Sequence, residues 1–382
     1  MSLQPERLAD IFVRLCEIDS PSRGEGRLAL FLRSLCASEF NAEIIEDNSA
    51  TVTGSDTGNL VIRIGDQNHA APPFFCNCHM DTVEPATGVK VRRNGNTFVS
   101  AGATILGADD KAGIAMLIEM ARSLKEDGAL LVPLEFVFTT CEEIGLLGAK
   151  NFDFSLLRAG FGYALDSTGI DLAVIAAPAA NHFRAEIRGL AAHAGLHPEN
   201  GINAIKLASL AVAALPLGRL DDESTANVGL ISGGQATNIV PELVRLEGEV
   251  RSHNARKLAS YTAAIENELR LVIERHGFLL PDAPGSGRRQ ADFDFRVEEQ
   301  FPGMRLKEGA PVLRRLQAAA AKLNRPLRFI MAGGGSDANI FGARGRPTAI
   351  LGIGMTDVHT TDESITLDSM VRTTELLLAV AG

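Results

Sequence analysis

The feature that most constrains the fold is a repeated pattern in which a short apolar segment ends in acidic residues or histidine. The polar residues that follow three such segments are, in chain order, His79 and Asp81, Glu142 and Glu143, and Asp166. Short apolar segments that alternate with helices are typical of an α/β fold with a central sheet. In such folds the functional residues lie in loops at the carboxyl ends of the strands, so we expect these side chains to lie close together.

Two adjacent acids, Asp109 and Asp110, precede a helix predicted over 113–121. A helix N-terminus favours negative charge, so capping accounts for either acid alone. Neighbouring carboxylates repel each other unless a cation or a hydrogen-bond network holds both. Near the C-terminus, His359 follows the apolar segment 348–353 and adds a second histidine. Two histidines and several carboxylates fit two divalent metal ions.

The length of the chain and a change of pattern indicate two domains. With 382 residues, 46% of them hydrophobic, the chain exceeds the usual size of a single core. Residues 181–301 read as strand, helix, two strands, helix and strand, a βαββαβ order that is ferredoxin-like. We therefore predict a metal-binding α/β domain of residues 1–180 and 302–382, with a central mixed sheet flanked by helices. The inserted domain spans 181–301, and its long loop is Asp282–Gly287.

Charge and composition exclude several classes of function. The net charge is −10, and the chain has two Tyr and no Trp, which makes nucleic acid a poor partner. No apolar run approaches the length of about 18 residues that a membrane-spanning helix needs. The N-terminal segment opens an amphipathic helix rather than a signal peptide. We expect no membrane partner and a cytoplasmic location.

The five cysteines are odd in number and read as reduced thiols, which agrees with a cytoplasmic location. Cys76 and Cys78 form a C-x-C pair that would suit a thiolate metal site. On a strand, however, alternate residues share a face, which places both thiols in the core beside Phe74.

Taken together, these motifs resemble the dinuclear zinc peptidases and amidohydrolases. This family includes peptidase T, a carnosinase-like dipeptidase, glutamate carboxypeptidase, succinyl-diaminopimelate desuccinylase and aminoacylase-1. The resemblance spans nearly the whole chain and rests on motifs in the family's order: His79-x-Asp81, Gly107–Gly113, Glu142-Glu143, Asp166 and His359. It implies that the inserted domain is a lid and dimerisation domain. We therefore expect the protein to be a homodimer that forms through this domain.

The resemblance also implies a set of five ligands for two zinc ions, with cobalt or manganese as alternatives. The ligands are His79 and Asp166 at one ion, Glu143 and His359 at the other, and Asp109 bridging both. Asp81 would orient His79 through its carboxylate. Glu142 would be the general base that takes a proton from the bridging water. A cis peptide bond between Asp109 and Asp110 is a further feature of the family.

Further residues are expected to serve the substrate. By the resemblance, His193 reaches the active site of the partner subunit and supports the oxyanion. His197 has no such match in the family, and we interpret it as structural. Asn238 and Arg251 resemble lid residues that bind the terminal carboxylate of the substrate. Arg251 has an alternative interpretation, in which it pairs with Glu247 or Glu249 on its own strand.

The segment 333–339 looks like the Gly-rich loop that covers the substrate in this family. Its candidate substrate-binding residues are Gly334, Ser336, Asp337 and Asn339. A nucleotide-binding loop is not expected, because neither Lys-Ser nor Lys-Thr follows the glycines.

The family contains enzymes of more than one specificity. Asp at position 166 is the acid associated with its aminopeptidases, and Ala338-Asn339 after Ser336-Asp337 is closest to the peptidase T-like branch. We therefore expect a tripeptide aminopeptidase that acts on short peptides. The alternatives are an N-acyl amino-acid amidohydrolase with the same metal centre and a non-catalytic binding protein on the same fold.

Overall fold

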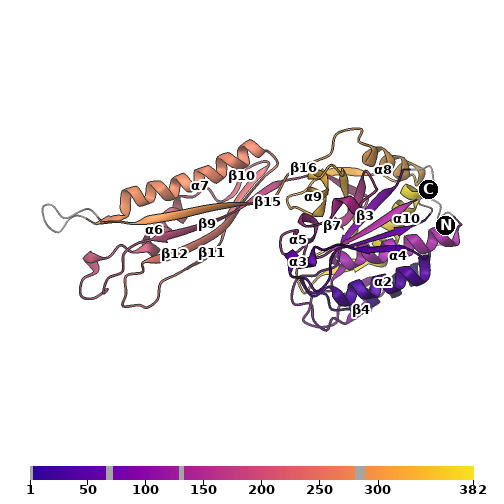
Figure 1. Ribbon diagram of the computed structural model, residues 1–382, viewed down its shortest axis with the longest axis horizontal. Coiled ribbons are helices and arrows are strands. Elements are labelled where there is room, and N and C mark those ends of the chain that lie inside the picture. Colours follow the sequence, from indigo (N-terminus) through magenta and orange to yellow (C-terminus); the bar gives the residue numbers. More distant parts are fainter. Residues whose placement is uncertain (1–2, 66–71, 129–132, 280–288) are drawn as a thin grey trace. The chain divides into compact units, whose positions relative to one another are not determined.

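A computed structural model describes residues 3–65, 72–128, 133–279 and 289–382 of the chain (Figure 1). The chain divides into two compact units. The first consists of Met1–Ala177 and Met304–Gly382, and the second of Pro178–Gly303. Sequence analysis placed the inserted domain at 181–301. The loop that we expected at Asp282–Gly287 lies outside the described residues.

The described part of the first unit is built around a mixed sheet of nine strands. These strands are β1 (Glu43–Glu46), β2 (Leu60–Ile64), β3 (Phe74–His79), β6 (Leu134–Thr139), β7 (Gly162–Ser167), β8 (Leu172–Ala177), β16 (Met304–Arg305), β17 (Arg328–Met331) and β18 (Thr348–Gly352). Their order is β1-β2-β6-β3-β7-β18-β8-β16, and β17 also pairs with β8. The neighbours β6, β3, β7 and β18 run parallel, so the ends of β3, β6 and β7 lie at one edge of the sheet.

Helices cover both faces of this sheet. They are α1 (Pro5–Cys16), α2 (Gly26–Phe40), α3 (Ala50–Thr53), α4 (Ala108–Glu126), α5 (Leu147–Lys150), α8 (Pro311–Lys322), α9 (Asp337–Ala343) and α10 (Leu367–Ala381), with a 3-10 turn at Phe154–Leu156. The opposite faces are marked by consecutive residues of β3. Phe74 packs edge-on against Tyr163, whose hydroxyl donates to the carbonyl of Val312 in α8, while Phe75 packs against Phe341 of α9. A small sheet of β19 (Ser364–Thr366), β5 (Thr97–Ser100) and β4 (Val91–Asn94) completes the unit.

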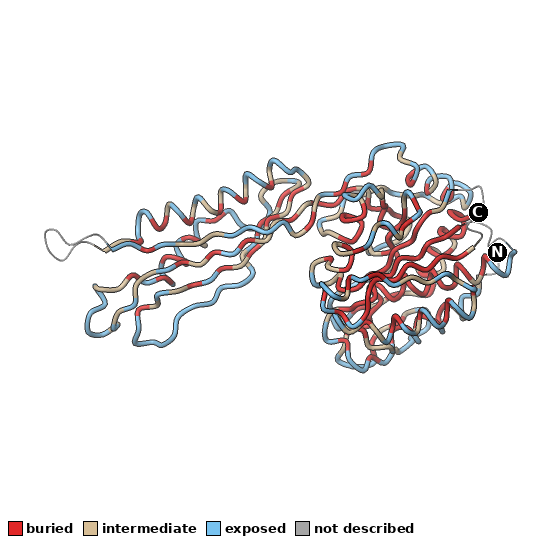
Figure 2. The backbone as a smooth tube through the Cα atoms, in the orientation of Figure 1, coloured by how far each residue is buried: buried red, intermediate tan, exposed pale blue. Residues whose placement is uncertain are grey.

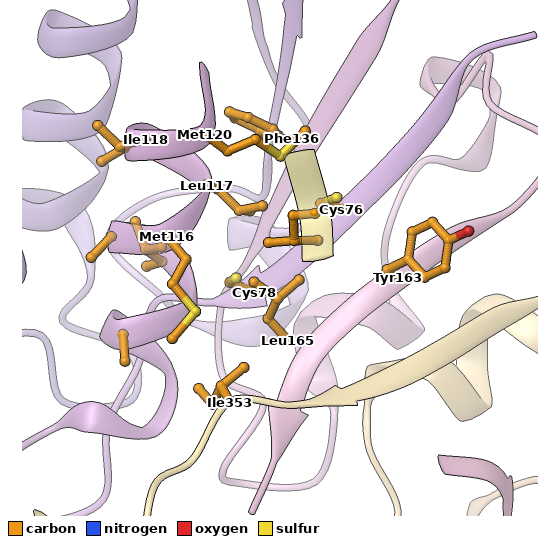
Figure 3. Packing of buried hydrophobic residues seen from close by; sticks show 14 of the residues in the cluster. Cys76, Cys78, Met116, Leu117, Ile118, Met120, Phe136, Tyr163, Leu165 and Ile353 are labelled. Atoms are coloured by element: carbon orange, nitrogen blue, oxygen red, sulfur yellow. The ribbon is translucent and has the colours of Figure 1, made fainter. Parts of the chain in front are cut away.

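The central strands are buried on both faces, as expected of parallel strands covered by helices (Figure 2). Helix α4 lies against β3 and β7 and is itself covered by α1 and α10. Cys76 and Cys78 are buried in the same core as Met116 and Leu117 of α4, which confirms the core interpretation of the C-x-C pair (Figure 3). All five cysteines are free and buried.

The second unit has the predicted βαββαβ order. Its elements are β9 (Ala179–Arg188), α6 (Ala204–Ala214), β10 (Gly218–Asp221), β11 (Ser224–Gly233), β12 (Leu243–Ser252), α7 (Ala255–His276), β13 (Phe278–Leu279), β14 (Arg289–Gln290) and β15 (Asp292–Phe301), with a 3-10 turn at Pro198–Asn200. The main sheet is antiparallel, in the order β10-β11-β12-β9-β15. The apolar sides of α6 and α7 pack on this sheet in a separate core. The short strands β10, β13 and β14 are additions to the predicted pattern, and β13 pairs with β14.

The helices within the described residues include none that is both long enough and apolar enough to cross a membrane.

Candidate metal centre

His79 is the last residue of β3, where a buried strand delivers its side chain to the edge of the sheet. The ring is almost fully buried, with Nε2 3.0 Å from Asp109 Oδ1. We expected the Asp81 carboxylate to hold the other ring nitrogen. Instead, Nδ1 lies 2.8 Å from the main-chain carbonyl oxygen of Asp81, and the nearer carboxylate oxygen is 3.7 Å away. A carbonyl partner at Nδ1 leaves Nε2 free to bind a cation.

The Asp81 carboxylate has another set of partners. It accepts hydrogen bonds from Ser22 Oγ at 2.6 Å, from the amide of Glu142 at 2.9 Å and from the amide of Glu143 at 3.2 Å. These contacts tie the end of β3 to the turn that follows β6. Asp81 therefore fixes the position of the two glutamates through their main chain.

Asp109 lies where the chain enters α4, and its backbone angles are not helical. The Asp109–Asp110 peptide bond is cis. The Asp109 carboxylate lies between two imidazoles, since its Oδ2 is 3.4 Å from His359 Nε2 and its Oδ1 is 3.0 Å from His79 Nε2. Burial opposes ionisation of this carboxyl, but the contacts with His359 and His79 outweigh burial and hold the pKa of Asp109 below its usual range. Asp109 is thus an anion placed between the two histidines.

Glu143 and His359 form the other half of the cluster. Nε2 of His359 is 3.1 Å from Glu143 Oε2, and contacts with Asp109 and Glu143 raise the pKa of His359 to about 10. Oε1 of Glu143 is buried and has no hydrogen-bond partner in the described part of the chain. The raised pKa of His359 shows that the acidic surroundings favour positive charge at this point.

These residues fit a divalent cation. One ligand atom from each of His79, Asp109 and Glu143 lies within 4.8 Å of the other two. Imidazole and carboxylate ligands suit zinc, and the unpartnered Glu143 oxygen is the kind of buried acceptor that an ion would satisfy. The structure therefore brings His79, Asp109, Glu143 and His359 together.

Asp166 and Glu142 belong to the same electrostatic neighbourhood. Burial and the charge of Asp109 raise the pKa of Asp166 to about 8. Burial also raises the pKa of Glu142 well above its ordinary value, with a further contribution from Asp166. Crowded carboxylates of this kind are stabilised by bound cations, because each cation removes part of their mutual repulsion.

The side chains of the Gly-rich segment 333–339 contact the fold itself. Ser336 and Asn339 form a reciprocal capping box at the start of α9, and both are buried. Asp337 is also buried and accepts a hydrogen bond from Thr139 Oγ1 at the end of β6. Gly334 is half-buried. These side chains hold α9 against the strand that leads to the glutamates.

The three candidates in the second unit fall into two groups. His193 and Asn238 are exposed and lie in adjoining segments, where the amide of Ala194 donates to the carbonyl oxygen of Asn238 at 2.9 Å. Arg251 instead forms two hydrogen bonds of 2.9 Å with Glu249 on the same strand. The pairing that we considered as the alternative for Arg251 is therefore present.

Two buried carboxylates that support the cluster were not predicted from the sequence. Glu363 accepts hydrogen bonds from the amides of Leu106, Gly107 and Asp109. Glu25 accepts one from the amide of Cys141, next to Glu142. The contacts span at least 116 residues. Glu25 is an isolated acid in the sequence, whereas Glu363 forms an acidic pair with Asp362 shortly after His359, a signal that the prediction did not use.

Comparison with known proteins identifies a peptidase family and related structures. Residues 75–382 match the model of peptidase family M20/M25/M40. The chain is 37% identical over 376 residues to the uncharacterized protein YqjE of Bacillus subtilis, covering 98% of this chain and 97% of YqjE. It is similar to the crystal structure of aminopeptidase PepT from Bacillus cereus, with a TM-score of 0.87 and 36% identity over 99% of this chain and 98% of PepT. A tripeptidase from Staphylococcus aureus gives a TM-score of 0.91 with 32% identity, covering 100% of this chain and 98% of that one.

Proposed function

The chain belongs to peptidase family M20/M25/M40, and from this premise we propose that it is a zinc-dependent tripeptide aminopeptidase. The enzyme is a metallopeptidase with the mixed α/β fold of that family. The observation that carries the proposal is the cluster of His79, Asp109, Glu143 and His359 at the strand ends. Similarity to an aminopeptidase and a tripeptidase at above 30% identity supports the substrate class.

We assign five ligands to two zinc ions: His79 and Asp166, Glu143 and His359, with Asp109 shared. When bound, the ions supply positive charge that lowers the pKa of a water molecule and polarises the scissile carbonyl. Glu142 accepts a proton from the water that attacks the carbonyl carbon and donates it to the departing amine nitrogen. Asp81 holds Glu142 in place through its main-chain amide, 2.9 Å from the Asp81 carboxylate.

The remaining candidates are assigned to the substrate. His193 would support the oxyanion, and Asn238 would contact the substrate from the adjoining segment. Arg251 would bind a terminal carboxylate by exchanging Glu249 for the substrate, since a guanidinium fork pairs equally well with either carboxylate. Gly334 offers main-chain contact, while Ser336, Asp337 and Asn339 shape the loop from within.

We also propose a homodimer formed through the second unit, because that unit has an exposed apolar sheet edge. Leu230 and Ile231 on β11 are 65% and 57% exposed. Pairing with β10 reaches only from Ser224 to Ala226, which leaves the end of β11 open in the described chain. A cytoplasmic location is supported by the five free cysteines.

The proposed function is tested by measuring amino-acid release from unblocked tripeptides and from N-acetyl amino acids. The purified protein is assayed as isolated, after chelator treatment, and after separate addition of zinc, cobalt or manganese. We expect cleavage of tripeptides that the chelator abolishes and zinc restores. Turnover of the acylated substrates alone would replace the peptidase by an amidohydrolase. Metal binding without turnover of either set would favour a non-catalytic protein.

A further inference from the structure

Glu363 is a buried acid whose carboxylate is held by main-chain amides. Only 1% of its surface is exposed, and its carboxylate accepts three main-chain hydrogen bonds from one turn. Oε2 accepts from the amides of Leu106 at 2.9 Å and Gly107 at 2.7 Å, and Oε1 accepts from the amide of Asp109 at 3.0 Å. A carboxylate that accepts several amide hydrogen bonds is strongly oriented, because each bond restricts both partners.

The turn that Glu363 holds is the one that carries Asp109 into the cluster. Its backbone departs from regular structure, with Gly107 in the left-handed region at φ 80° and Asp109 outside the helical region. Asp110 does not hold the turn, because its carboxylate contacts the amide of His79 instead. The amides of residues 106, 107 and 109 therefore depend on an acceptor from a distant part of the chain.

Glu363 also lies four residues after His359. One short segment thus brings His359 to the Asp109 carboxylate and Glu363 to the main chain of the same aspartate. Displacement of either group would alter the separation between Asp109 and His359, which is 3.4 Å at the nearest atoms.

We propose that Glu363 is a positioning residue that sets the place of the Asp109 carboxylate between the two metal ions. This inference rests on the proposed metal centre. In this role Glu363 binds neither metal nor substrate and acts only through the turn of residues 106–109. A merely structural carboxylate would contribute to folding without affecting metal affinity.

The test compares E363Q with the matched control E119Q. Glutamine keeps the size of the side chain but replaces one acceptor oxygen by an NH2 group, which cannot accept an amide hydrogen bond. Glu119 is also fully buried in the first unit, where it accepts from the amide of Gln4 and pairs with Arg7. It contacts none of the proposed ligands. Metal-depleted proteins are titrated with zinc in competition with a chromophoric chelator, and urea unfolding is measured without metal.

We expect E363Q to weaken zinc binding by about 10-fold to 100-fold, the usual effect of removing a partner behind a metal ligand. In E119Q, zinc affinity should stay within about twofold of the unchanged protein even where its urea midpoint falls. Cobalt-loaded E363Q should also show an altered visible absorption spectrum, because the ligand geometry changes. Wild-type zinc affinity and an unchanged cobalt spectrum in folded E363Q would overturn the proposal.

A second variant covers the case in which E363Q does not fold. E363D keeps both acceptor oxygens but withdraws them by one methylene, and we expect it to weaken zinc binding as well; unchanged affinity would again overturn the proposal. Failure of both variants to fold, while E119Q folds, would assign Glu363 to the fold alone and reject the positioning role. If the unchanged protein binds no zinc, the metal centre itself is wrong, a result distinct from failure of this inference.

Discussion

Two kinds of carboxylate around the cluster differ in what their oxygens contact. Asp109 and Glu143 direct oxygens toward imidazole nitrogens, as expected of metal ligands. Asp81, Glu25 and Glu363 direct theirs toward main-chain amides of the turns that carry the first kind. Main-chain amides are fixed donors, so a buried carboxylate bound to them moves less than one bound to a flexible side chain. The second kind therefore gives the first its geometry.

At the scale of single residues, Glu142→Gln should separate catalysis from metal binding. The amide cannot accept a proton, so we expect turnover of tripeptides to fall by about 100-fold to 10,000-fold. Zinc content should not change, because the ion pairs of the cluster involve Glu143 and not the side chain of Glu142. Turnover and zinc per chain are measured together, with Glu308→Gln at an exposed position as the control. Turnover within tenfold of the unchanged enzyme would refute the role of Glu142.

The cluster was predictable because His79, Glu143 and His359 follow apolar strand segments, whereas Asp109 belongs to an acidic pair that precedes a helix. His79, Asp109, Glu143 and His359 were all named in advance, and the structure brings them together. Their roles as ligands remain predictions. Glu363 was missed because its partners are amides about 254 residues away, which no local pattern records. Ser336 and Asn339 were read for the substrate, although their spacing also fits the capping box that the structure contains.

At the scale of secondary structure, the α/β class with a mixed sheet is confirmed. The βαββαβ order of the second unit was also predictable, since apolar and polar residues alternate along its strands and its helices are amphipathic. The positions of β1 and β16 at the sheet edges were not predictable from sequence. Edge pairing of strands only two to four residues long depends on tertiary packing more than on residue preference.

The contact between α4 and the sheet gives a second prediction, Gly113→Ala. A Cβ at this position would lie 2.8 Å from Cys78 Sγ and 2.9 Å from Leu165 Cβ, and closer still to Asp110 Oδ1. We expect a loss of about 1 to 3 kcal/mol in the free energy of unfolding, as for other overpacked cores. Urea unfolding measures the loss. The control is Gly102→Ala, where a Cβ has nothing within 4 Å, and it should stay within about 0.5 kcal/mol. Equal stability of the two variants would mean that α4 can shift away from the sheet.

At the scale of the whole molecule, buried thiols cause the free energy of unfolding to fall as the pH becomes alkaline. Burial is the main cause that raises the pKa of Cys36 to about 12, whereas a thiol in an unfolded chain ionises near about 8.5. Between these values the unfolded chain holds fewer protons than the folded chain. The stability from this group is therefore complete below about pH 8.5 and is lost as the pH rises toward 12.

The prediction is that Cys36→Ala reduces the fall in unfolding free energy between pH 8 and pH 10.5 by about 2 to 3 kcal/mol. Urea unfolding at the two pH values gives the fall for each protein. Ser38→Ala on the same helix removes no titrating group and should keep the full pH dependence. The same pH dependence in Cys36→Ala and the unchanged protein would show that this thiol does not contribute.

The assembly of the molecule provides the last prediction, because the two edges of the second sheet differ. At one edge, β11 carries the exposed Leu230 and Ile231 beyond the reach of β10. The other edge is β15, where Val297 is 46% exposed among charged neighbours. An open apolar strand edge invites pairing with the same edge of a second copy, which produces a two-fold symmetric dimer.

Lysine on an edge strand opposes such pairing, because its charge would have to be buried in the interface. We therefore expect Ile231→Lys to convert the protein from dimer to monomer in sedimentation velocity, halving the molecular mass. Val297→Lys adds the same charge to the opposite edge and should leave the dimer intact. A monomeric unchanged protein would reject the dimer outright. A dimer that survives Ile231→Lys but dissociates in Val297→Lys would instead place the interface at β15. Charged residues rather than apolar contacts would then determine the pairing.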